Sequence, residues 1–240
     1  MDLLTANDKF GEYPNSYYAW NSVFLPSFEI SKGELKCDVC IVGAGYTGLS
    51  AAIHLAEEGY KVIVLEAQRV GFGASGRNGG QVGTGQRVNQ LDLEKLVGND
   101  NAHRLWDVSL EAVELVKKLT KDIKGCAFQP GIVHASHKKS IISDEHHYVD
   151  HLRKLYNYKK IQKLNKEELR NIVNTEAYFG GYLDTGSGHV DPLNYVLGLA
   201  KKAHLKGVKI FEKTRALEIL QGASTVIKTP QSKVTASYVI

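Results

Sequence analysis

Three glycines followed by an acidic residue could hold the diphosphate and a ribose of a dinucleotide. Gly43, Gly45 and Gly48 have the spacing G-x-G-x-x-G, which allows backbone N–H groups at the start of a helix to approach a pyrophosphate. Glu66 follows eighteen residues after Gly48, and its carboxylate could accept hydrogen bonds from both ribose hydroxyls of an adenosine. Because the same charge would repel a 2′-phosphate, the sequence disfavours an NADP-type ligand.

The elements that must position these residues form a βαβ pattern. Residues 38–42 contain a short apolar run typical of a buried parallel strand, and Leu49, Ile53 and Ala56 then recur at helical spacing. Gly59 is expected to end that helix, and residues 61–65 form a second apolar run. The pattern therefore predicts that the glycines lie on a strand-to-helix turn and that Glu66 lies at the carboxyl edge of the sheet, where ligands bind.

A second glycine-dense stretch follows at residues 71–85, with seven glycines in fifteen residues. A flexible linker is the simplest interpretation, but linkers favour Ser and Thr repeats over an Arg-Asn-Gly-Gly-Gln string. We favour a ligand-binding loop, in which backbone amides and the Ser75 hydroxyl reach a diphosphate and Arg77 adds a charge-assisted contact. A nicotinamide dinucleotide needs no second glycine-rich loop directly after the acidic residue, whereas an extended flavin dinucleotide does. The loop therefore favours FAD.

The two glycine stretches together resemble a known family. Residues 42–49 and 73–81 are similar to the FAD-dependent D-amino-acid and glycine oxidase family, and a weaker likeness extends through the rest of the chain. The resemblance implies an α/β protein with a glutathione-reductase-type, Rossmann-like FAD domain and an inserted α+β substrate domain. It also implies oxidation of an amine carbon, with a linear amine such as gamma-glutamylputrescine as substrate and molecular oxygen as the electron acceptor. FAD would take the hydride, so no catalytic side chain is assigned.

The resemblance also assigns residues to the cofactor. Ala216 would contribute a backbone contact to adenine just beyond the third parallel strand, where many relatives have a bulkier aliphatic residue. The full set of predicted FAD-binding residues is Gly43, Ala44, Gly45, Tyr46, Thr47, Gly48, Glu66, Ala67, Gln68, Gly73, Ala74, Ser75, Arg77, Asn78, Gly79, Gly80, Gln81 and Ala216.

The remaining chain predicts further helices and strands. Residues 87–125 are expected to form an amphipathic helical run whose apolar face consists of Leu105, Val108, Ala112, Leu115 and Leu119. Ser143 or Asp144 is expected to cap the next helix. Asp191 and Pro192 are typical of a helix start, for a helix that runs to Lys206. Strands are expected at residues 128–135, 178–183 and 208–211, and a meander at 217–220, 225–228 and 234–240.

These elements suggest four segments. Residues 1–36 form an aromatic-rich arm packed on the first domain, and residues 37–124 the first part of the FAD domain. Residues 125–188 form the substrate-domain portion, and residues 189–240 the second part of the FAD domain. By the resemblance, a sequence of about the same length again is expected to follow residue 240, so the FAD domain is expected to be incomplete.

Composition and charge disfavour several classes of protein. The chain of 240 residues is 43% hydrophobic, enough for a buried core, and its net charge is only +4. Without a basic stripe interleaved with aromatic residues, nucleic acid is not an expected partner. No apolar run reaches the roughly eighteen residues of a membrane helix, and residues 1–36 lack the pattern of an export signal, so no membrane partner and a cytoplasmic location are predicted.

Cysteine and histidine spacings were weighed as metal or redox sites. Cys37 and Cys40 form a C-x-x-C pair on an expected strand, where residues three apart point to opposite faces, so the two sulfurs are expected to diverge. No second C-x-x-C follows. His147 and His151 are four residues apart on one helical face, but no third ligand is evident. No metal is predicted.

Two other functions remain open at this stage. The chain could be a non-catalytic FAD-binding fragment of an oxidase, or an oxidase of the D-amino-acid, glycine or sarcosine type. An NAD-linked dehydrogenase is disfavoured by residues 71–85. Without the missing half, apolar surface would lie uncovered, and weak FAD binding with negligible turnover is expected.

Overall fold

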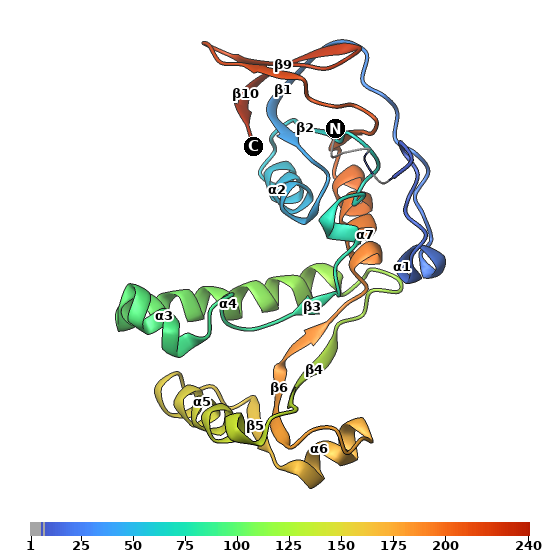
Figure 1. The fold of residues 1–240 in the computed structure, drawn as a ribbon. Coiled ribbons are helices and arrows are strands. Elements are labelled where there is room, and N and C mark those ends of the chain that lie inside the picture. Colours follow the sequence, from blue (N-terminus) through green and yellow to red (C-terminus); the bar gives the residue numbers. More distant parts are fainter. Residues whose placement is uncertain (1–5, 7) are drawn as a thin grey trace. The chain divides into compact units, whose positions relative to one another are not determined.

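A computed structural model describes residue 6 and residues 8–240 of the chain (Figure 1). Two compact units are present. The first contains the described residues up to Gly79, Asp122–Cys126 and Asp191–Ile240, and the second contains Gly80–Lys121 and Ala127–Val190. The predicted segment 37–124 is therefore divided, since residues 80–121 belong to the second unit. The physical reason is that β3 (Gln81–Val82) pairs with β6 (Gly180–His189) of that unit.

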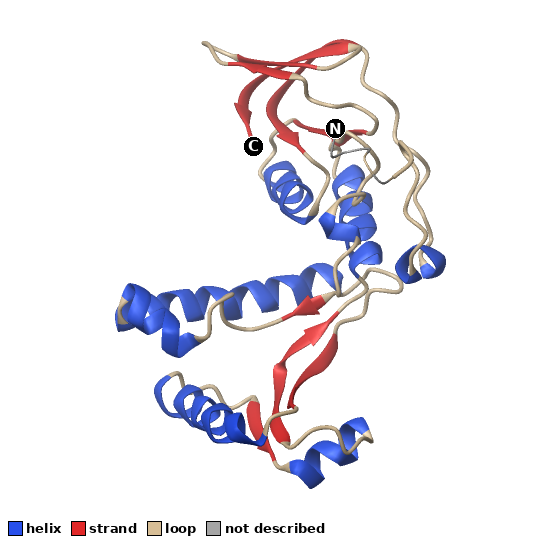
Figure 2. Cartoon of the chain, viewed as in Figure 1, coloured by secondary structure: helices blue, strands red, loops and turns tan. Residues whose placement is uncertain are grey.

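The first unit is built on a six-stranded sheet. Its strands are β1 (Gly33–Val42), β2 (Val62–Leu65), β7 (Lys209–Phe211), β8 (Glu218–Leu220), β9 (Thr225–Lys228) and β10 (Ser232–Val239), in the order β7-β2-β1-β10-β9-β8 (Figures 1 and 2). Strands β7, β2, β1 and β10 run parallel, and β10, β9 and β8 form an antiparallel meander. The predicted third parallel strand and the predicted meander are confirmed.

Two helices of the first unit pack against each other beside this sheet. Helix α2 (Tyr46–Glu57) follows β1, and α7 (Pro192–Leu205) precedes β7. Asp191 is the N-cap of α7, where its carboxylate accepts a hydrogen bond from Asn194 N at 2.8 Å, and Pro192 opens the helix. Both predictions for this helix start are confirmed. Leu49 and Ile53 of α2 are buried, as the helical spacing predicted.

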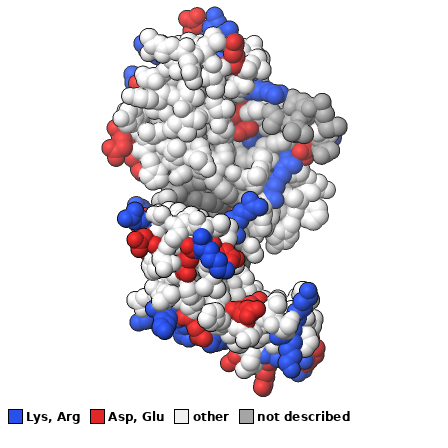
Figure 3. Space-filling model, turned by 60° about the vertical axis from the view of Figure 1, so that its left-hand side comes forward, with Lys and Arg blue, Asp and Glu red and all other residues white. Residues whose placement is uncertain are grey.

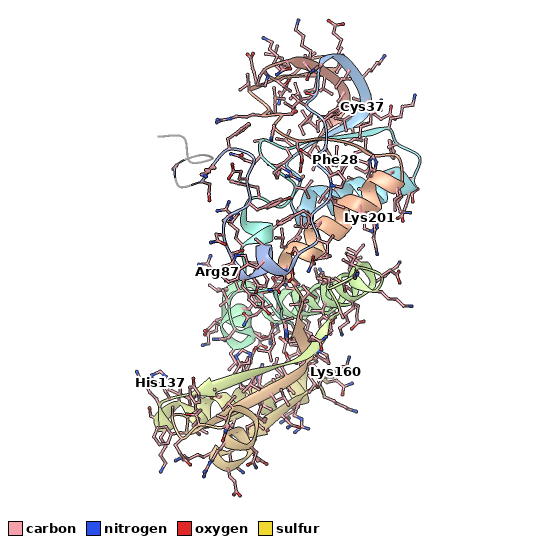
Figure 4. The ribbon with its side chains drawn as sticks, turned by 90° about the vertical axis from the view of Figure 1, so that its right-hand side faces the viewer. Phe28, Cys37, Arg87, His137, Lys160 and Lys201 are labelled. Atoms are coloured by element: carbon pink, nitrogen blue, oxygen red, sulfur yellow. The ribbon has the colours of Figure 1, made fainter. Side chains whose placement is uncertain are left out.

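The described part of the N-terminal arm is tied to the first unit through a buried carboxylate. Glu212 forms an ion pair with Arg69 at 2.8 Å and accepts hydrogen bonds from Ser27 Oγ, Phe28 N and Val70 N. Phe28 lies beside α7 (Figure 4), where its ring centroid is 5.4 Å from that of His204. The arm includes the short helix α1 (Tyr17–Asn21) and ends where β1 begins. Residues 1–5 and 7 of the predicted arm lie outside the described residues.

Cys37 and Cys40 do not point to opposite faces, which corrects the prediction from strand geometry. The backbone N–H groups of Asp38 and Val39 both donate to Lys61 O, at 2.9 and 3.2 Å. Both thiols pack in the same apolar cluster, and the side chains of Cys37 and Cys40 form a hydrogen bond with each other. The hydrogen bond to Cys37, together with burial, raises the pKa of the Cys40 thiol.

The three cysteines of the chain are expected to resist labelling. Cys37, Cys40 and Cys126 are all free and buried, and thiol reagents react with accessible thiolates. Under native conditions an aromatic disulfide reagent should label them far more slowly than a free thiol, whereas in denaturant all three should react. Rapid native labelling of Cys37 or Cys40 would show that the cluster around β1 opens readily.

The second unit combines a four-stranded antiparallel sheet with helices. Strands β4 (Gln129–Ser136) and β5 (Ile161–Leu164) both pair with β6, which also pairs with β3. The predicted strand at 128–135 is confirmed, and the one predicted at 178–183 begins at Gly180 and continues to His189. Helix α5 (Ile142–Leu155) follows the 3₁₀ helix η2 (Lys139–Ile141), so Ser143 and Asp144 lie inside the helix and neither is its N-cap.

The helical run predicted at 87–125 is two helices. Helix α3 (Gln90–Val97) and helix α4 (Asn99–Thr120) are separated by Gly98, whose φ of 79° breaks the helix. The predicted apolar face of α4 is confirmed only in part, because Leu119 is buried but Val108 and Leu115 are 56% and 39% exposed. Trp106 and Val113 are buried instead, together with Ser109, which accepts a hydrogen bond from Gly85 N at 2.9 Å.

Sequence analysis did not identify helix α6 (Lys166–Val173). Its N-cap Asn165 and Glu168 form a reciprocal capping box. Among the described residues, no helix has the length and apolarity needed to cross a membrane, and no group of three His, Cys, Asp or Glu side chains is arranged to hold a metal. On the face drawn in Figure 3, Lys and Arg side chains are interspersed with Asp and Glu.

Candidate cofactor site

The first glycine stretch is a tight turn between β1 and α2. Strand β1 ends at Val42 and α2 begins at Tyr46, and Gly43 N donates to Leu65 O of β2 at 2.8 Å. A Cβ on Gly48 would lie 2.2 Å from Gly43 O, a distance that no side chain tolerates. Gly48 is therefore required for the close packing of the helix on the turn, as predicted from the spacing.

Glu66 lies directly after β2, beside the turn. Its carboxylate accepts hydrogen bonds from Ala44 N at 2.8 Å and from Gln68 N at 2.9 Å. Burial raises the pKa of the Glu66 carboxyl, and the hydrogen bonds from Ala44 and Gln68 oppose that rise. A carboxylate has about four lone-pair positions, so these two bonds leave capacity for hydroxyl donors of a ligand.

The second glycine stretch folds back onto the first. Gly71 N donates to Ala44 O at 3.0 Å. Ser75, on the 3₁₀ helix η1 (Ala74–Gly76), accepts a hydrogen bond from Tyr46 N at 3.1 Å. A Cβ on Gly45 would lie 2.9 Å from Ser75 Oγ. The structure therefore brings Gly45, Tyr46 and Ser75 together at the N-terminus of α2, where the helix dipole favours an anion.

Asn78 and Tyr46 link the second glycine stretch to helix α7. Asn78 Nδ2 donates to Ala74 O at 3.0 Å and to the Tyr46 hydroxyl at 3.2 Å. The Tyr46 hydroxyl in turn donates to Pro192 O at 3.0 Å, and its ring centroid lies 4.7 Å from that of Tyr195. Sequence analysis did not identify Tyr195, because nothing in the spacing of α7 marks one buried residue as a neighbour of the turn.

Arg77 has partners within the protein. Its guanidinium forms an ion pair with Asp8 at 2.8 Å, donates to Phe72 O at 2.6 Å and lies over the Phe72 ring at 4.4 Å. Because these contacts already neutralise the guanidinium charge, we do not propose a direct contact between Arg77 and the diphosphate. Asp8 was not identified from the sequence, since it lies 69 residues away in the arm.

The other predicted residues are divided between the two units. Gln68 is buried and accepts a hydrogen bond from Gly11 N at 2.7 Å, and Ala216 packs against the apolar cluster around Cys37 and Cys40. Gly80 and Gln81 belong to the second unit, where Gly80 O accepts a hydrogen bond from Val190 N. The other predicted residues of the first unit are Thr47 of α2, Ala67 beside Glu66, and Gly73 and Gly79 of the second glycine stretch.

The residues of the first unit fit the adenosine and diphosphate parts of FAD. A Cβ would fill the space between Gly45 and Ser75, whereas Gly73 and Gly79 have open space where a Cβ would stand. Such a ligand needs hydrogen-bond donors, an acceptor and a bare surface. The backbone N–H groups at the helix start, the half-buried Glu66 carboxylate and the glycine backbone provide them. A cavity of about 510 Å³ lies elsewhere in this unit, between residues 29–35 and 204–211, and contains none of the predicted residues. We give more weight to the turn, since its chemistry matches a dinucleotide.

Comparison with known proteins decides the family. Residues 38–240 match the family model described as FAD dependent oxidoreductase. The chain belongs to this family of FAD-dependent oxidoreductases. FAD is the cofactor of the family, so the prediction of FAD over a nicotinamide dinucleotide is confirmed at the level of the family.

The chain is similar in sequence to two curated proteins and in fold to one solved structure. It is 38% identical over 91% of its length to "Probable oxidoreductase OrdL" of Rhizobium meliloti, covering 52% of that protein. It is 37% identical over 95% of its length to "Gamma-glutamylputrescine oxidoreductase" of Escherichia coli, covering 54%. The crystal structure of glycine oxidase from Geobacillus kaustophilus matches the fold with a TM-score of 0.68, 22% identity and coverage of 85% of this chain and 54% of that one.

The predicted fold class is confirmed by these matches. The chain spans about half the length of the curated relatives it matches.

Proposed function

We propose that the intact protein is an FAD-dependent oxidase of a linear amine, with gamma-glutamylputrescine or a closely similar compound as substrate and molecular oxygen as the electron acceptor. The observation that carries FAD binding is the convergence of Glu66, the turn at Gly43–Gly45 and Ser75 at the start of α2. The substrate proposal is supported by the likeness to the gamma-glutamylputrescine enzyme, which extends over 95% of this chain.

Different residues of the chain would bind different parts of the cofactor. Backbone N–H groups at the start of α2 bind the diphosphate, and Ser75 exchanges its hydrogen bond from Tyr46 N for a contact with the ligand. Glu66 accepts hydrogen bonds from the adenosine ribose, and Ala67, Gln68 and Ala216 line the adenosine part. When bound, FAD supplies the acceptor for a hydride from the amine carbon.

Replacing Glu66 tests the proposed ribose contact. Glu66→Ala removes a charged acceptor, and we expect FAD binding to weaken by roughly 1 to 3 kcal/mol, the range for hydrogen bonds to charged groups. Glu66→Gln keeps the size and one acceptor oxygen, so it should lose less affinity for FAD than Glu66→Ala. Glu58→Ala, at an exposed position just after α2, is the control. Fluorescence titration with FAD gives the dissociation constants, and unchanged binding by Glu66→Ala would remove the residue from the site.

The substrate is tested by hydrogen peroxide release. Purified protein with FAD is supplied with gamma-glutamylputrescine, D-alanine or sarcosine at equal concentrations. We expect the largest kcat/KM with gamma-glutamylputrescine, in the chain extended to the length of its relatives. Faster release with D-alanine or sarcosine would favour the D-amino-acid or sarcosine type of oxidase. A protein that binds FAD without any release would match the alternative of a cofactor-binding fragment.

A further inference from the structure

The longest strand pairing of the second unit is interrupted beside β3. In the ladder between β4 and β6, Pro130 is opposite Gly188 and Ile132 is opposite Asp184. Two steps along β4 (130 to 132) thus face four steps along β6 (184 to 188), so β6 carries two extra residues at this point. Backbone groups in such a bulge lose their partners in the ladder and need other acceptors.

The side chain of Asp184 supplies these acceptors from a buried position. Oδ1 accepts hydrogen bonds from Gly186 N at 2.9 Å and Ser187 N at 3.2 Å, and also from the Tyr158 hydroxyl. Burial raises the pKa of Tyr158, so its hydroxyl keeps the proton that it donates. Asp184 is only 5% exposed. A carboxylate that receives this many donors is held in one orientation.

The other carboxylate oxygen reaches the segment that follows β3. Oδ2 accepts a hydrogen bond from Thr84 Oγ1 at 3.0 Å and another from Ser187 Oγ. Ser187 Oγ in turn accepts from Thr84 N at 2.9 Å. The ladder between β3 and β6 consists of only two residue pairs, Gln81 with His189 and Val82 with Gly188. Thr84 therefore adds two hydrogen bonds to a short strand that the ladder alone would hold weakly.

We propose that Asp184 is a positioning residue for residues 80–85, and that through Thr84 it orders the end of the glycine stretch that runs on from residues 71–79. The proposal rests on the proposed function, because it takes the glycine stretch that residues 80–85 continue as part of the FAD site. Asp184 itself touches no cofactor atom in this account. Asp184 changes FAD affinity only by ordering residues 80–85. A side chain that merely filled the same space would leave FAD affinity unchanged.

Four variants of the full chain test the proposal. Asp184→Asn replaces an acceptor oxygen by an NH₂ donor that faces existing donors. Thr84→Val removes only the hydroxyl that Asp184 holds, with almost no change of shape, and Thr84→Ser keeps that hydroxyl. Asp150→Asn is the matched control, since Asp150 lies on the surface of the same unit and pairs with Lys163. Thermal melting shows that each variant is folded before it is compared.

Hydrogen exchange and FAD titration are the two readouts. We expect Thr84→Val to speed amide exchange in residues 80–86 at least tenfold, to weaken FAD binding about tenfold (~1.4 kcal/mol) and to change the visible spectrum of the bound flavin. Asp184→Asn should act in the same direction and more strongly. Thr84→Ser and Asp150→Asn should behave as wild type.

Two results would overturn the proposal. One is wild-type exchange in residues 80–86 of Thr84→Val. The other is faster exchange there with unchanged FAD affinity and an unchanged flavin spectrum, which would leave Asp184 a structural residue only. Failure of the wild-type protein to bind FAD would instead contradict the proposed function, and the exchange data would still decide whether Asp184 holds the segment.

Discussion

Gly45→Val is expected to abolish FAD binding while the protein stays folded. A Cβ at this position would already lie 2.9 Å from Ser75 Oγ, and the two further methyl groups of valine would fill the space in front of the first N–H groups of α2. The diphosphate could then no longer reach these donors. We expect the affinity for FAD to fall at least about a hundredfold, which corresponds to ~2.8 kcal/mol.

The control for Gly45→Val is a glycine in the same unit with room for a side chain. At Gly222 the nearest atom to an added Cβ is Ser224 O at 3.4 Å, so Gly222→Ala should bind FAD as wild type. Fluorescence titration measures the affinity, and circular dichroism shows whether Gly45→Val keeps its helices. Wild-type affinity in a folded Gly45→Val protein would move the diphosphate away from this turn.

Glu212→Ala is expected to destabilise the first unit by about 3 to 5 kcal/mol, the range for breaking a buried ion pair. Its side chain is 1% exposed, and its partner Arg69 is 15% exposed. Removing the carboxylate leaves the guanidinium charge without its acceptor and leaves the N–H groups of Phe28 and Val70 without partners. The arm would still be held by its other contacts, which include Asp8 with Arg77, Gly11 with Gln68, Tyr13 with Val70 and Ser31 with Thr214.

Urea unfolding followed by circular dichroism measures the effect of Glu212→Ala. Glu218→Ala is the matched control, because Glu218 pairs with Lys228 at 2.8 Å with both side chains about half exposed. An exposed pair of this kind contributes at most about 1 kcal/mol. An equal loss of unfolding free energy in the two variants would mean that Glu212 does not hold the arm through a buried network.

The cofactor turn could be predicted from the sequence because its determinants are local. Glycine spacing, an apolar run on each side and an acid at the end of the second run are all contained in residues 38–66, and each has one simple structural consequence. The start of α7 was predictable for the same reason, since Asp191 and Pro192 act on the helix that follows them directly. The meander and the third parallel strand also followed from short apolar runs.

The errors arose where distant residues or a single backbone irregularity decide the outcome. Asp38 N and Val39 N both donate to Lys61 O, which precedes β2, and Cys37 and Cys40 pack in the same cluster. The buried face of α4 is set by Trp106 and its neighbours in the second unit, which the helical spacing of smaller apolar residues did not reveal. The ion pair between Arg77 and Asp8 could not be predicted for the same reason, because it joins residues 69 positions apart.

Two other features have a local indication in the sequence. Asn165 and Glu168 have the spacing of a capping box, which would have identified α6. Gly98 lies inside the predicted helical run, and glycine is a common helix stop, so a division into two helices could have been considered. The role of Asp184 had no such indication, because the bulge in β6 is visible only in the register with β4.

The visible absorption spectrum of the purified protein, followed by titration with FAD and NAD, tests the central claim most directly. We predict the absorption bands of bound flavin, or their perturbation when FAD is added to protein that has lost it, with FAD bound more tightly than NAD. A colourless protein that leaves the spectrum of added FAD unchanged, or that binds NAD more tightly than FAD, would contradict the assignment of the turn at Gly43–Gly45 and Glu66 to this cofactor.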